Sequence, residues 1–139
     1  MPRRSVGWAA GLFDGEGCIS ATFQPYAHLQ VSVANSHRRA LEWFRVVVGS
    51  GKVYMIGKPT RKTRTKWQWR IGSRADVERV LSLLLPFLVI KRMEAKATLS
   101  FLKRSAKRRR LRMRIDLLIR TTGREWESLV ARLHKLKGR

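Results

Sequence analysis

The sequence predicts a mixed α/β (α+β) fold in which an antiparallel sheet is covered by helices. Residues 18–33, and again residues 52–71, alternate apolar and polar side chains, and this period of two is typical of strands with one buried face. A helical pattern precedes each strand pair, and from residue 73 onward apolar residues recur with helical spacing. The predicted order is therefore helix, two strands, helix, two strands and several helices. We expect one domain over residues 1–139, because this length suits a single core.

Turn residues set the expected limits of the first elements. The first helix should end at Gly17, since glycine commonly follows a last helical turn. Residues 25–27 are expected to join the first two strands. Ser36 is the expected N-cap of a second helix, which runs to Val48 and ends at the Gly-Ser-Gly sequence of residues 49–51.

The second half of the chain is delimited in the same way. A hairpin leaves along residues 52–58 and returns along 66–71, with a basic loop between them. Residues 73–76, Ser-Arg-Ala-Asp, resemble a capping box that opens a helix, and Pro86 should end it. The remainder is expected to form three more helices, over residues 91–106, 111–120 and 125–137.

The charge balance points to a polyanionic partner. The chain holds 31 Lys and Arg residues against 9 Asp and Glu, a formal net charge of +22. Such a surface repels itself unless a polyanion relaxes the repulsion. The cations are spread over predicted strands, loops and helices, whereas membrane binding usually gathers them on one amphipathic helix. Nucleic acid, and not a membrane, is therefore the predicted partner.

The single cysteine, Cys18, excludes an internal disulfide and a zinc site built from cysteines. No apolar run approaches the roughly 20 residues of a membrane span, and the N-terminal residues lack the apolar core of a secretory signal. We therefore expect an intracellular compartment that contains DNA, either an organelle such as a chloroplast or mitochondrion, or the prokaryotic cytoplasm.

Three glycines mark the first helix. Gly7, Gly11 and Gly15 are spaced four apart and so share one helical face that has almost no side-chain bulk. Each glycine should weaken a helix by about 1 kcal/mol relative to alanine. A sequence that carries this cost usually needs another backbone to approach closely, and small-residue faces allow two helices to do so.

Residues 9–17, Ala-Ala-Gly-Leu-Phe-Asp-Gly-Glu-Gly, resemble the LAGLIDADG motif of homing endonucleases position for position, with Ala9 in place of the leading leucine. The predicted element order is similar to the α-β-β-α-β-β-α core of that family, which carries an antiparallel DNA-binding sheet saddle. The resemblance covers residues 5 to about 105, and the extra C-terminal helices lie outside it. It implies an endonuclease that cuts double-stranded DNA at a long pseudo-palindromic site by metal-dependent phosphodiester hydrolysis.

The resemblance also assigns the metal site. Glu16 matches the carboxylate that binds the metal, Mg²⁺ or Mn²⁺, and the carbonyl of Gly15 is the accompanying backbone ligand. A carboxylate at the negative end of a helix is otherwise disfavoured, which favours a nearby cation. Asp14 lies on a different face of the helix and is interpreted as structural, with a direct catalytic part as the alternative.

Three further catalytic positions are implied by the resemblance. Asn35, at the end of the second strand, matches a polar residue that holds water or metal near the scissile phosphate. Arg39 matches a basic residue that organises this water, and Arg38 would serve instead if the register slips by one. Lys91 follows a Pro-Phe-Leu segment and matches a residue that stabilises phosphate charge. For each, an ordinary surface role is the alternative.

The polar faces of both hairpins form the predicted DNA-binding surface. This face carries no acidic residue, whereas an ordinary solvated sheet face would mix Lys with Glu. A two-stranded ribbon fits the major groove, where Gln, Arg and Lys can read base edges. The predicted contacts from the strands are Ser20, Thr22, Gln24, His28, Gln30, Ser32, Lys52, Tyr54, Lys66, Gln68 and Arg70. Arg61, Lys62 and Arg64 in the loop, with the basic run of residues 103–114, are expected to contact the DNA backbone.

One motif in a chain of this length implies a homodimer, with Gly7, Ala10, Gly11 and Asp14 at the predicted dimer interface. Three other functions stay open. An RNA-binding maturase of the same fold would bind intron RNA, and a catalytically inactive regulator would bind without cutting. A ribosomal-type basic protein is the third, but it would not explain the glycine face.

Overall fold

The computed structural model describes residues 3–22, 28–110 and 115–138, with side chains described outside residues 107–124. The helices are α1 (Arg3–Glu16), α2 (Arg38–Val48), α3 (Arg74–Leu84), the short 3₁₀ helix η1 (Leu85–Phe87), α4 (Arg92–Arg110) and α5 (Ile115–Lys137). The strands are β1 (Gly17–Thr22), β2 (His28–Asn35), β3 (Lys52–Gly57) and β4 (Lys66–Ile71). The predicted mixed fold is thereby confirmed, with the expected order of helices and strands.

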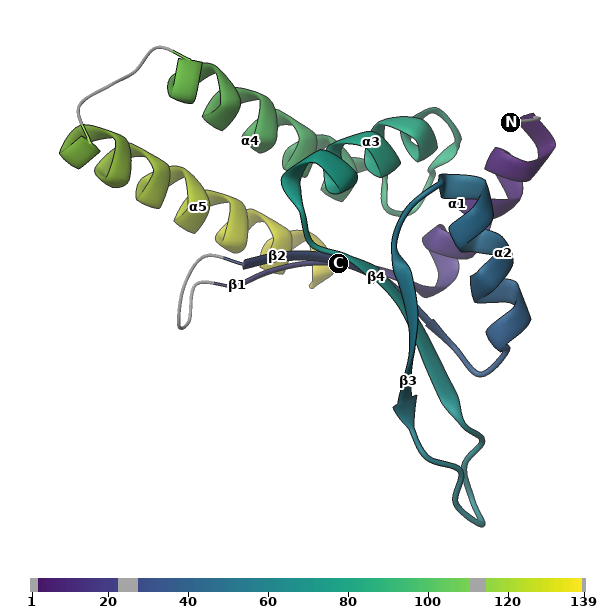
Figure 1. Cartoon of the computed structure of the whole chain (residues 1–139). Coiled ribbons are helices and arrows are strands. Elements are labelled where there is room, and N and C mark those ends of the chain that lie inside the picture. The colour runs from purple at the N-terminus through teal and green to yellow at the C-terminus, as the bar shows by residue number, and fades with distance from the viewer. Residues whose placement is uncertain (1–2, 23–27, 111–114, 139) are drawn as a thin grey trace.

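The four strands form one antiparallel sheet in the order β1-β2-β4-β3. The two hairpins therefore meet along β2 and β4, with Val31 paired to Ile71 and Asn35 paired to Trp67. The helices lie on one side of the sheet, and the β3–β4 hairpin extends well beyond the rest of the chain (Figure 1). The opposite side of the sheet is left without a covering layer in this protomer.

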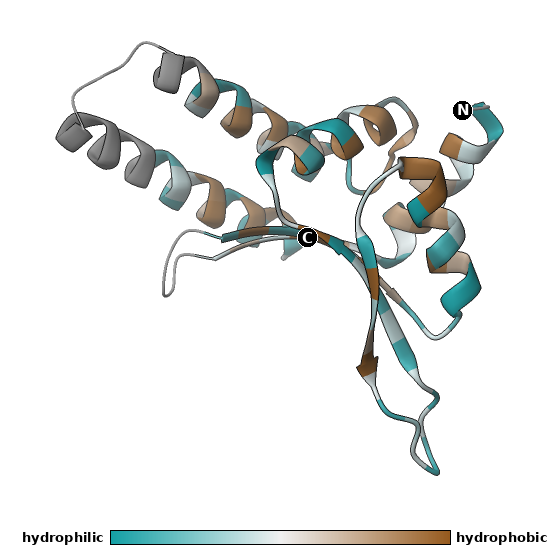
Figure 2. Ribbon diagram, viewed as in Figure 1, coloured by the Kyte–Doolittle hydropathy of each residue, from teal (hydrophilic) through white to brown (hydrophobic). Residues whose placement is uncertain are grey.

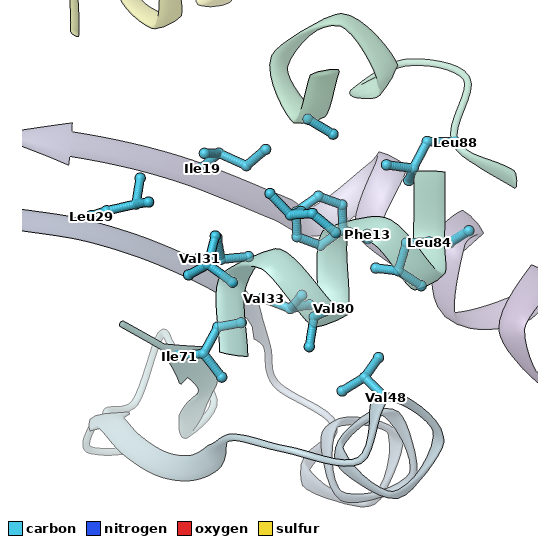
Figure 3. Close-up of a cluster of buried hydrophobic side chains, with 14 of the residues drawn as sticks. Phe13, Ile19, Leu29, Val31, Val33, Val48, Ile71, Val80, Leu84 and Leu88 are labelled. Carbon is cyan, nitrogen blue, oxygen red and sulfur yellow. The ribbon is translucent and has the colours of Figure 1, made fainter. Parts of the chain in front are cut away.

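The core lies between the sheet and helices α1, α2 and α3. Ile19, Val31 and Ile71 are cross-strand neighbours in one row of the sheet, and all three side chains are buried. Phe13 of α1 and Leu84 of α3 are fully buried against this side of the sheet (Figure 3). The alternation that predicted the strands therefore arises because every second side chain packs beneath the helices.

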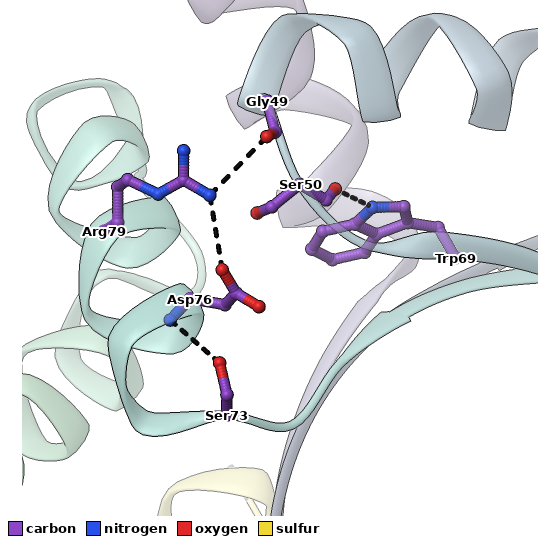
Figure 4. A network of polar contacts seen from close by, with 6 residues as sticks. All are labelled: Gly49, Ser50, Trp69, Ser73, Asp76 and Arg79. Atoms are coloured by element: carbon purple, nitrogen blue, oxygen red, sulfur yellow. Dashed lines mark hydrogen bonds and ion pairs between the residues drawn. The ribbon is translucent and has the colours of Figure 1, made fainter.

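Polar contacts fix the ends of α2 and α3 (Figure 4). Ser73 Oγ accepts a hydrogen bond from Asp76 N at 3.2 Å, as expected of the predicted N-cap. Gly49 ends α2 in the left-handed conformation, with φ 78°, and Arg79 Nη2 lies 3.5 Å from its carbonyl oxygen. Trp69, fully buried, donates from Nε1 to Ser50 O at 2.8 Å. The loop before β3 is thus tied to both the sheet and α3.

Two predicted boundaries were wrong. The N-cap of α2 is His37 and not Ser36, because His37 Nδ1 accepts the hydrogen bond of Ala40 N at 3.2 Å. Two separate helices were expected over residues 111–120 and 125–137, but from Ile115 onward the chain forms one helix, α5, which continues through Gly123; residues 111–114 lie outside the described residues. A single glycine costs a helix only about 1 kcal/mol, which is too little to end a helix of this length.

Helices α4 and α5 run side by side at the end of the sheet that carries β1 and β2 (Figure 1). Trp126 of α5 is buried, packs edge-on against Phe101 of α4 and donates from Nε1 to Thr22 O at 2.9 Å. At the far end of α5, Lys137 Nζ lies 3.6 Å from Cys18 Sγ. The last helix is therefore anchored along β1. Among the described residues, none of the helices combines the length and apolar character that crossing a membrane requires.

Candidate active site and nucleic-acid interface

The C-terminal end of α1 delivers an exposed carboxylate to the start of the sheet. Gly15 and Glu16 are both exposed, and β1 begins at the next residue, Gly17. A Cβ atom at Gly17 would collide with the carbonyl oxygen and ring of Phe13, so only glycine allows the chain to turn this tightly into the strand. The close approach fixes where Glu16 lies, directly before the strand that carries Cys18, Ser20 and Thr22.

Asp14 has a structural role inside the protomer. Its Oδ2 accepts a hydrogen bond from Val89 N at 2.9 Å, and its Oδ1 accepts one from Lys91 N at 3.0 Å. The carboxylate therefore holds the connection between η1 and α4 against the end of α1. This agrees with the structural interpretation of Asp14. It also places Lys91, a predicted active-site residue 75 positions after Glu16 in the chain, on a segment bound to the helix that carries Glu16.

Asn35 forms the turn between β2 and α2. Its Oδ1 accepts a hydrogen bond from His37 N at 2.8 Å. By register Asn35 is paired with Trp67 and so belongs to the helix-covered side of the sheet, at its rim. One acceptor site of the side-chain carbonyl oxygen is thus occupied, and the amide NH₂ can donate to a water molecule or a phosphate.

The structure separates the two arginines that the sequence left as alternatives. The Arg38 guanidinium lies 4.6 Å from the ring centre of Trp67, and its Nε is 3.8 Å from Glu42 Oε1. Arg39 is exposed, makes no ion pair with a described residue, and lies on the exposed face of α2 beside Trp43 and Val46. Arg38 therefore covers Trp67 and has an acidic partner in Glu42, whereas Arg39 has no ion pair with a described residue, which favours Arg39 as the arginine that contacts a ligand.

On the uncovered side of the sheet, mostly polar side chains are aligned in rows that cross the strands. One row contains Cys18, Ser32, Arg70 and Lys52, and the next contains Ala34, Gln68 and Tyr54. Two further rows pair Ser20 with Gln30 and Thr22 with His28. From residue 17 to residue 73 the only acidic residue is Glu42, which lies on α2 and not on the sheet. The predicted polar face is therefore assembled as one continuous acid-free surface.

Two predicted contacts need qualification. Ser32 belongs to the polar face by register but is only 6% exposed, so it offers almost no surface to a ligand. Gln24 lies outside the described residues. Of the basic run at residues 103–114, Lys103 and Arg104 are exposed on α4, and the side chains of residues 107–114 lie outside the description.

The loop between β3 and β4 is hydrophilic and carries the three basic residues predicted to contact the DNA backbone (Figure 2). A tight turn orders its centre, because Thr60 Oγ1 accepts from Thr63 N at 3.0 Å and the two hydroxyls lie 2.6 Å apart. Arg61, Lys62 and Arg64 are all exposed around this turn. Lys58, in the same loop, and Lys66, at the start of β4, bring the number of exposed cations to five.

The glycine face of α1 is open. A Cβ atom added at Gly7, Gly11 or Gly15 would meet nothing within 4 Å in this protomer. Trp8 on the same helix is 40% exposed. Ala10 was wrongly predicted to belong to this face: it is 0% exposed, because it packs into the chain's own core. The candidate face for a second helix is therefore built from the glycines and not from Ala10.

Several features were not found from the sequence. The Arg70 guanidinium lies 4.2 Å from the ring centre of Tyr54 on the polar face. Lys137 reaches the same face beside Cys18 from a helix over 100 residues later in the chain. Val89 and Ile90 are 80% and 71% exposed on the segment that Asp14 holds. In the sequence, the apolar side chains of Val89 and Ile90 after a Pro-Phe-Leu segment would fit a buried core position as well as an exposed one, so their exposure could not be predicted.

The donor set at the end of α1 fits a hard divalent cation in part. The Glu16 carboxylate and the Gly15 carbonyl are oxygen ligands of the kind that Mg²⁺ and Mn²⁺ prefer. Among the described residues, no group of three or more His, Cys, Asp or Glu side chains lies close enough to hold a metal. The described residues of one protomer therefore do not form a complete side-chain metal site around Glu16, and water, a bound phosphate or a second chain could supply further ligands.

Neither a protein-family model nor a curated protein sequence matches the chain. Among solved structures, the homing endonuclease I-CvuI in complex with its target is similar over 96% of this chain and 82% of that chain, with a TM-score of 0.75 and 20% identity. The homing endonuclease I-TnaI is similar over 96% and 95%, with a TM-score of 0.64 and 16% identity. The LAGLIDADG meganuclease I-AabMI, bound to uncleaved DNA, is similar over 90% of this chain and 43% of that chain, with a TM-score of 0.69 and 21% identity. The chain therefore has the fold of the LAGLIDADG homing endonucleases.

Proposed function

We propose that the protein is a sequence-specific homing endonuclease that cuts double-stranded DNA by metal-dependent phosphodiester hydrolysis. The observation that carries this proposal is the position of Glu16, an exposed carboxylate directly before an acid-free polar sheet. On a protein of net charge +22, an acid at this point would repel DNA unless a cation lies between them. The similarity in fold to DNA-bound homing endonucleases supports the same assignment.

Glu16 and the Gly15 carbonyl would hold a Mg²⁺ or Mn²⁺ ion. When bound, the ion supplies an activated water and neutralises charge on the scissile phosphate. Lys91 and Arg39 stabilise the negative charge that grows on the phosphate oxygens, as positively charged donors do in phosphoryl chemistry. Asn35, through its free amide, orients water beside the phosphate. No protein nucleophile is needed for this reaction.

We further propose that the active form is a homodimer paired through the glycine face of α1. A helical face with almost no side-chain bulk allows two backbones to approach closely. The surface at Gly7, Gly11 and Gly15 is such a face and is open to a second helix. Two-fold pairing would bring two Glu16 carboxylates toward one axis and add a second carboxylate to a site that the described residues of one protomer do not complete.

The DNA target follows from this symmetry. A two-fold dimer presents the same polar sheet twice, so the target is expected to be a pseudo-palindrome of two related half-sites. The grid of strand side chains reads base edges in the major groove, and the cations at the β3–β4 loop contact phosphates and set the register. Exposed Lys137, at the end of α5 and beside Cys18, extends the basic surface beyond the hairpins.

The test is cleavage of a randomised double-stranded DNA library by the full chain with added magnesium, followed by sequencing of the cut ends. We expect cut ends to share one pseudo-palindromic sequence, and cutting to stop when the magnesium is chelated. Random cut ends, or cutting that survives chelation, would contradict the proposal. So would a protein that binds structured RNA tightly and leaves every duplex in the library intact.

A further inference from the structure

Arg70 lies in the middle of the polar sheet. It stands in the row of Cys18, Ser32 and Lys52, with a strand on each side of its own. Arg70 is exposed, and among the described residues no carboxylate forms an ion pair with it. Its guanidinium donors therefore remain available to a ligand that approaches the sheet.

The guanidinium of Arg70 is held in place by Tyr54. Its central carbon lies 4.2 Å from the ring centre of Tyr54, on the neighbouring strand β3. Tyr54 is cross-strand from Gln68, so its ring reaches Arg70 along the diagonal between adjacent rows. Stacking on the ring restricts the long side chain without using the N–H groups in the guanidinium plane. This distinguishes Arg70 from the loop cations, for which the described residues provide no such support.

A fixed guanidinium in the major groove is suited to one base. Guanine presents two acceptors there, O6 and N7, and a planar fork of N–H donors binds both at once. A phosphate also accepts two hydrogen bonds from arginine, but phosphates line the groove edges. Arg70 is flanked by β2 and β3 and so faces the groove floor when the sheet lies in the groove.

We propose that Arg70, held over the ring of Tyr54, reads a guanine base in each half of the DNA target. The inference rests on the proposed function and adds the identity of one base and the residue that positions its reader. Tyr54 is a positioning residue here, because it acts through Arg70. The row of Arg70 contains Cys18, which is two residues from Glu16 in the chain. The row of Thr22 and His28 lies two rows farther from Glu16 on the same face of the sheet. The guanine is therefore expected toward the centre of the site and not at its outer ends.

The experiment is selection of bound duplexes from a randomised library without divalent metal, so that binding is read apart from cutting. The full-length wild-type chain is compared with Arg70→Ala, Arg70→Gln, Tyr54→Leu and Tyr54→Phe. Lys62→Ala serves as the control for a backbone contact. Base frequencies at each position and overall affinity are measured for each protein, and circular dichroism establishes that each variant is folded.

We expect the wild type to enrich guanine at one symmetric position. Arg70→Ala should lower that preference by about 5- to 150-fold, and Arg70→Gln should shift it toward adenine. Tyr54→Leu should lower the guanine preference by about two- to five-fold, whereas Tyr54→Phe keeps the ring and should keep the preference. Lys62→Ala should weaken all sequences equally.

The outcomes separate the two proposals. If the wild type enriches no sequence, the proposed function is wrong. If a sequence is enriched but Arg70→Ala leaves every base preference unchanged, or weakens all sequences equally as Lys62→Ala does, the inference is wrong and the function stands. If Tyr54→Leu keeps the full guanine preference, Tyr54 does not position Arg70.

Discussion

The carboxylate of Asp14 accepts a hydrogen bond from the backbone nitrogen of Lys91 at 3.0 Å. This contact joins α1, which ends at Glu16, to the segment that precedes α4. A second hydrogen bond, from Val89 N at 2.9 Å, uses the other oxygen of the same carboxylate. Asp14 therefore joins the helix that carries Glu16 to the segment that carries Lys91.

Replacing Asp14 should weaken this link. Asp14→Ala leaves two backbone N–H groups without their partner and should lower the free energy of unfolding by about 1–2 kcal/mol. Chemical denaturation measures this loss. Glu78→Ala is the matched control, because Glu78 is exposed and has no ion pair with a described residue, and it should change stability by less than about 0.5 kcal/mol. Equal stability of the two variants would show that the Asp14 contacts contribute nothing.

The two arginines at the start of α2 should behave differently. Arg39→Ala should slow DNA cutting by about 10²-fold or more while duplex affinity stays within a few-fold, because its charge is needed mainly as the phosphate reacts. Arg38→Ala should leave the cutting rate within a few-fold, since Arg38 covers Trp67 and pairs with Glu42. Single-turnover cleavage rates on one duplex decide between them. A slower Arg38→Ala and an unaffected Arg39→Ala would reverse the assignment.

Gly11 and Gly17 provide a test of the dimer. Gly11→Val should still fold, as circular dichroism can establish, since a Cβ at Gly11 meets nothing in the protomer. It should nevertheless lower the mass measured by light scattering to that of a monomer and reduce cutting. Gly17→Ala should instead destabilise the fold by about 1–3 kcal/mol, because its Cβ collides with Phe13. A Gly11→Val variant that pairs and cuts like wild type would disprove pairing through this face.

Salt should weaken binding steeply. If the acid-free surface neutralises six to ten phosphates, affinity for duplex DNA should fall by about 10³- to 10⁵-fold between roughly 50 and 200 mM salt. Replacing Arg61, Lys62 and Arg64 together by alanine should reduce the slope of log affinity against log salt by about three, one for each lost phosphate contact. Fluorescence anisotropy over this range measures both slopes. A flat titration would exclude a duplex backbone as the partner of these charges.

Most of the fold could be predicted from the sequence, because local patterns of apolar, polar and capping residues indicate most of its helices and strands. Period-two alternation marked the strands, and the Ser73 cap and Gly49 end were visible as short motifs. The N-cap of α2 was misplaced because His37 and Ser36 can both accept a backbone hydrogen bond, and packing decides between them. The break expected before residue 125 failed for a related reason, since one glycine is too weak a signal to end a long helix.

The candidate site was predictable only where one motif carries it. Glu16 and Gly15 belong to a single contiguous segment, so their placement at the end of α1 followed from the motif. The Asp14–Lys91 contact joins residues 77 positions apart, and the Tyr54–Arg70 stack depends on the register of two strands. Such long-range pairings leave no local periodic pattern. The burial of Ala10 and Ser32 was missed because each depends on neighbours that the sequence does not bring together locally.

The most direct test of the central claim is the rate at which Glu16→Gln cuts the selected DNA target in magnesium. The substitution keeps the shape of the side chain and removes the charge that would hold the cation. We expect cutting to be abolished while affinity for the same duplex stays within a few-fold of wild type, with circular dichroism establishing the fold. A Glu16→Gln protein that cuts at close to the wild-type rate would contradict the assignment of Glu16 as the metal-binding carboxylate.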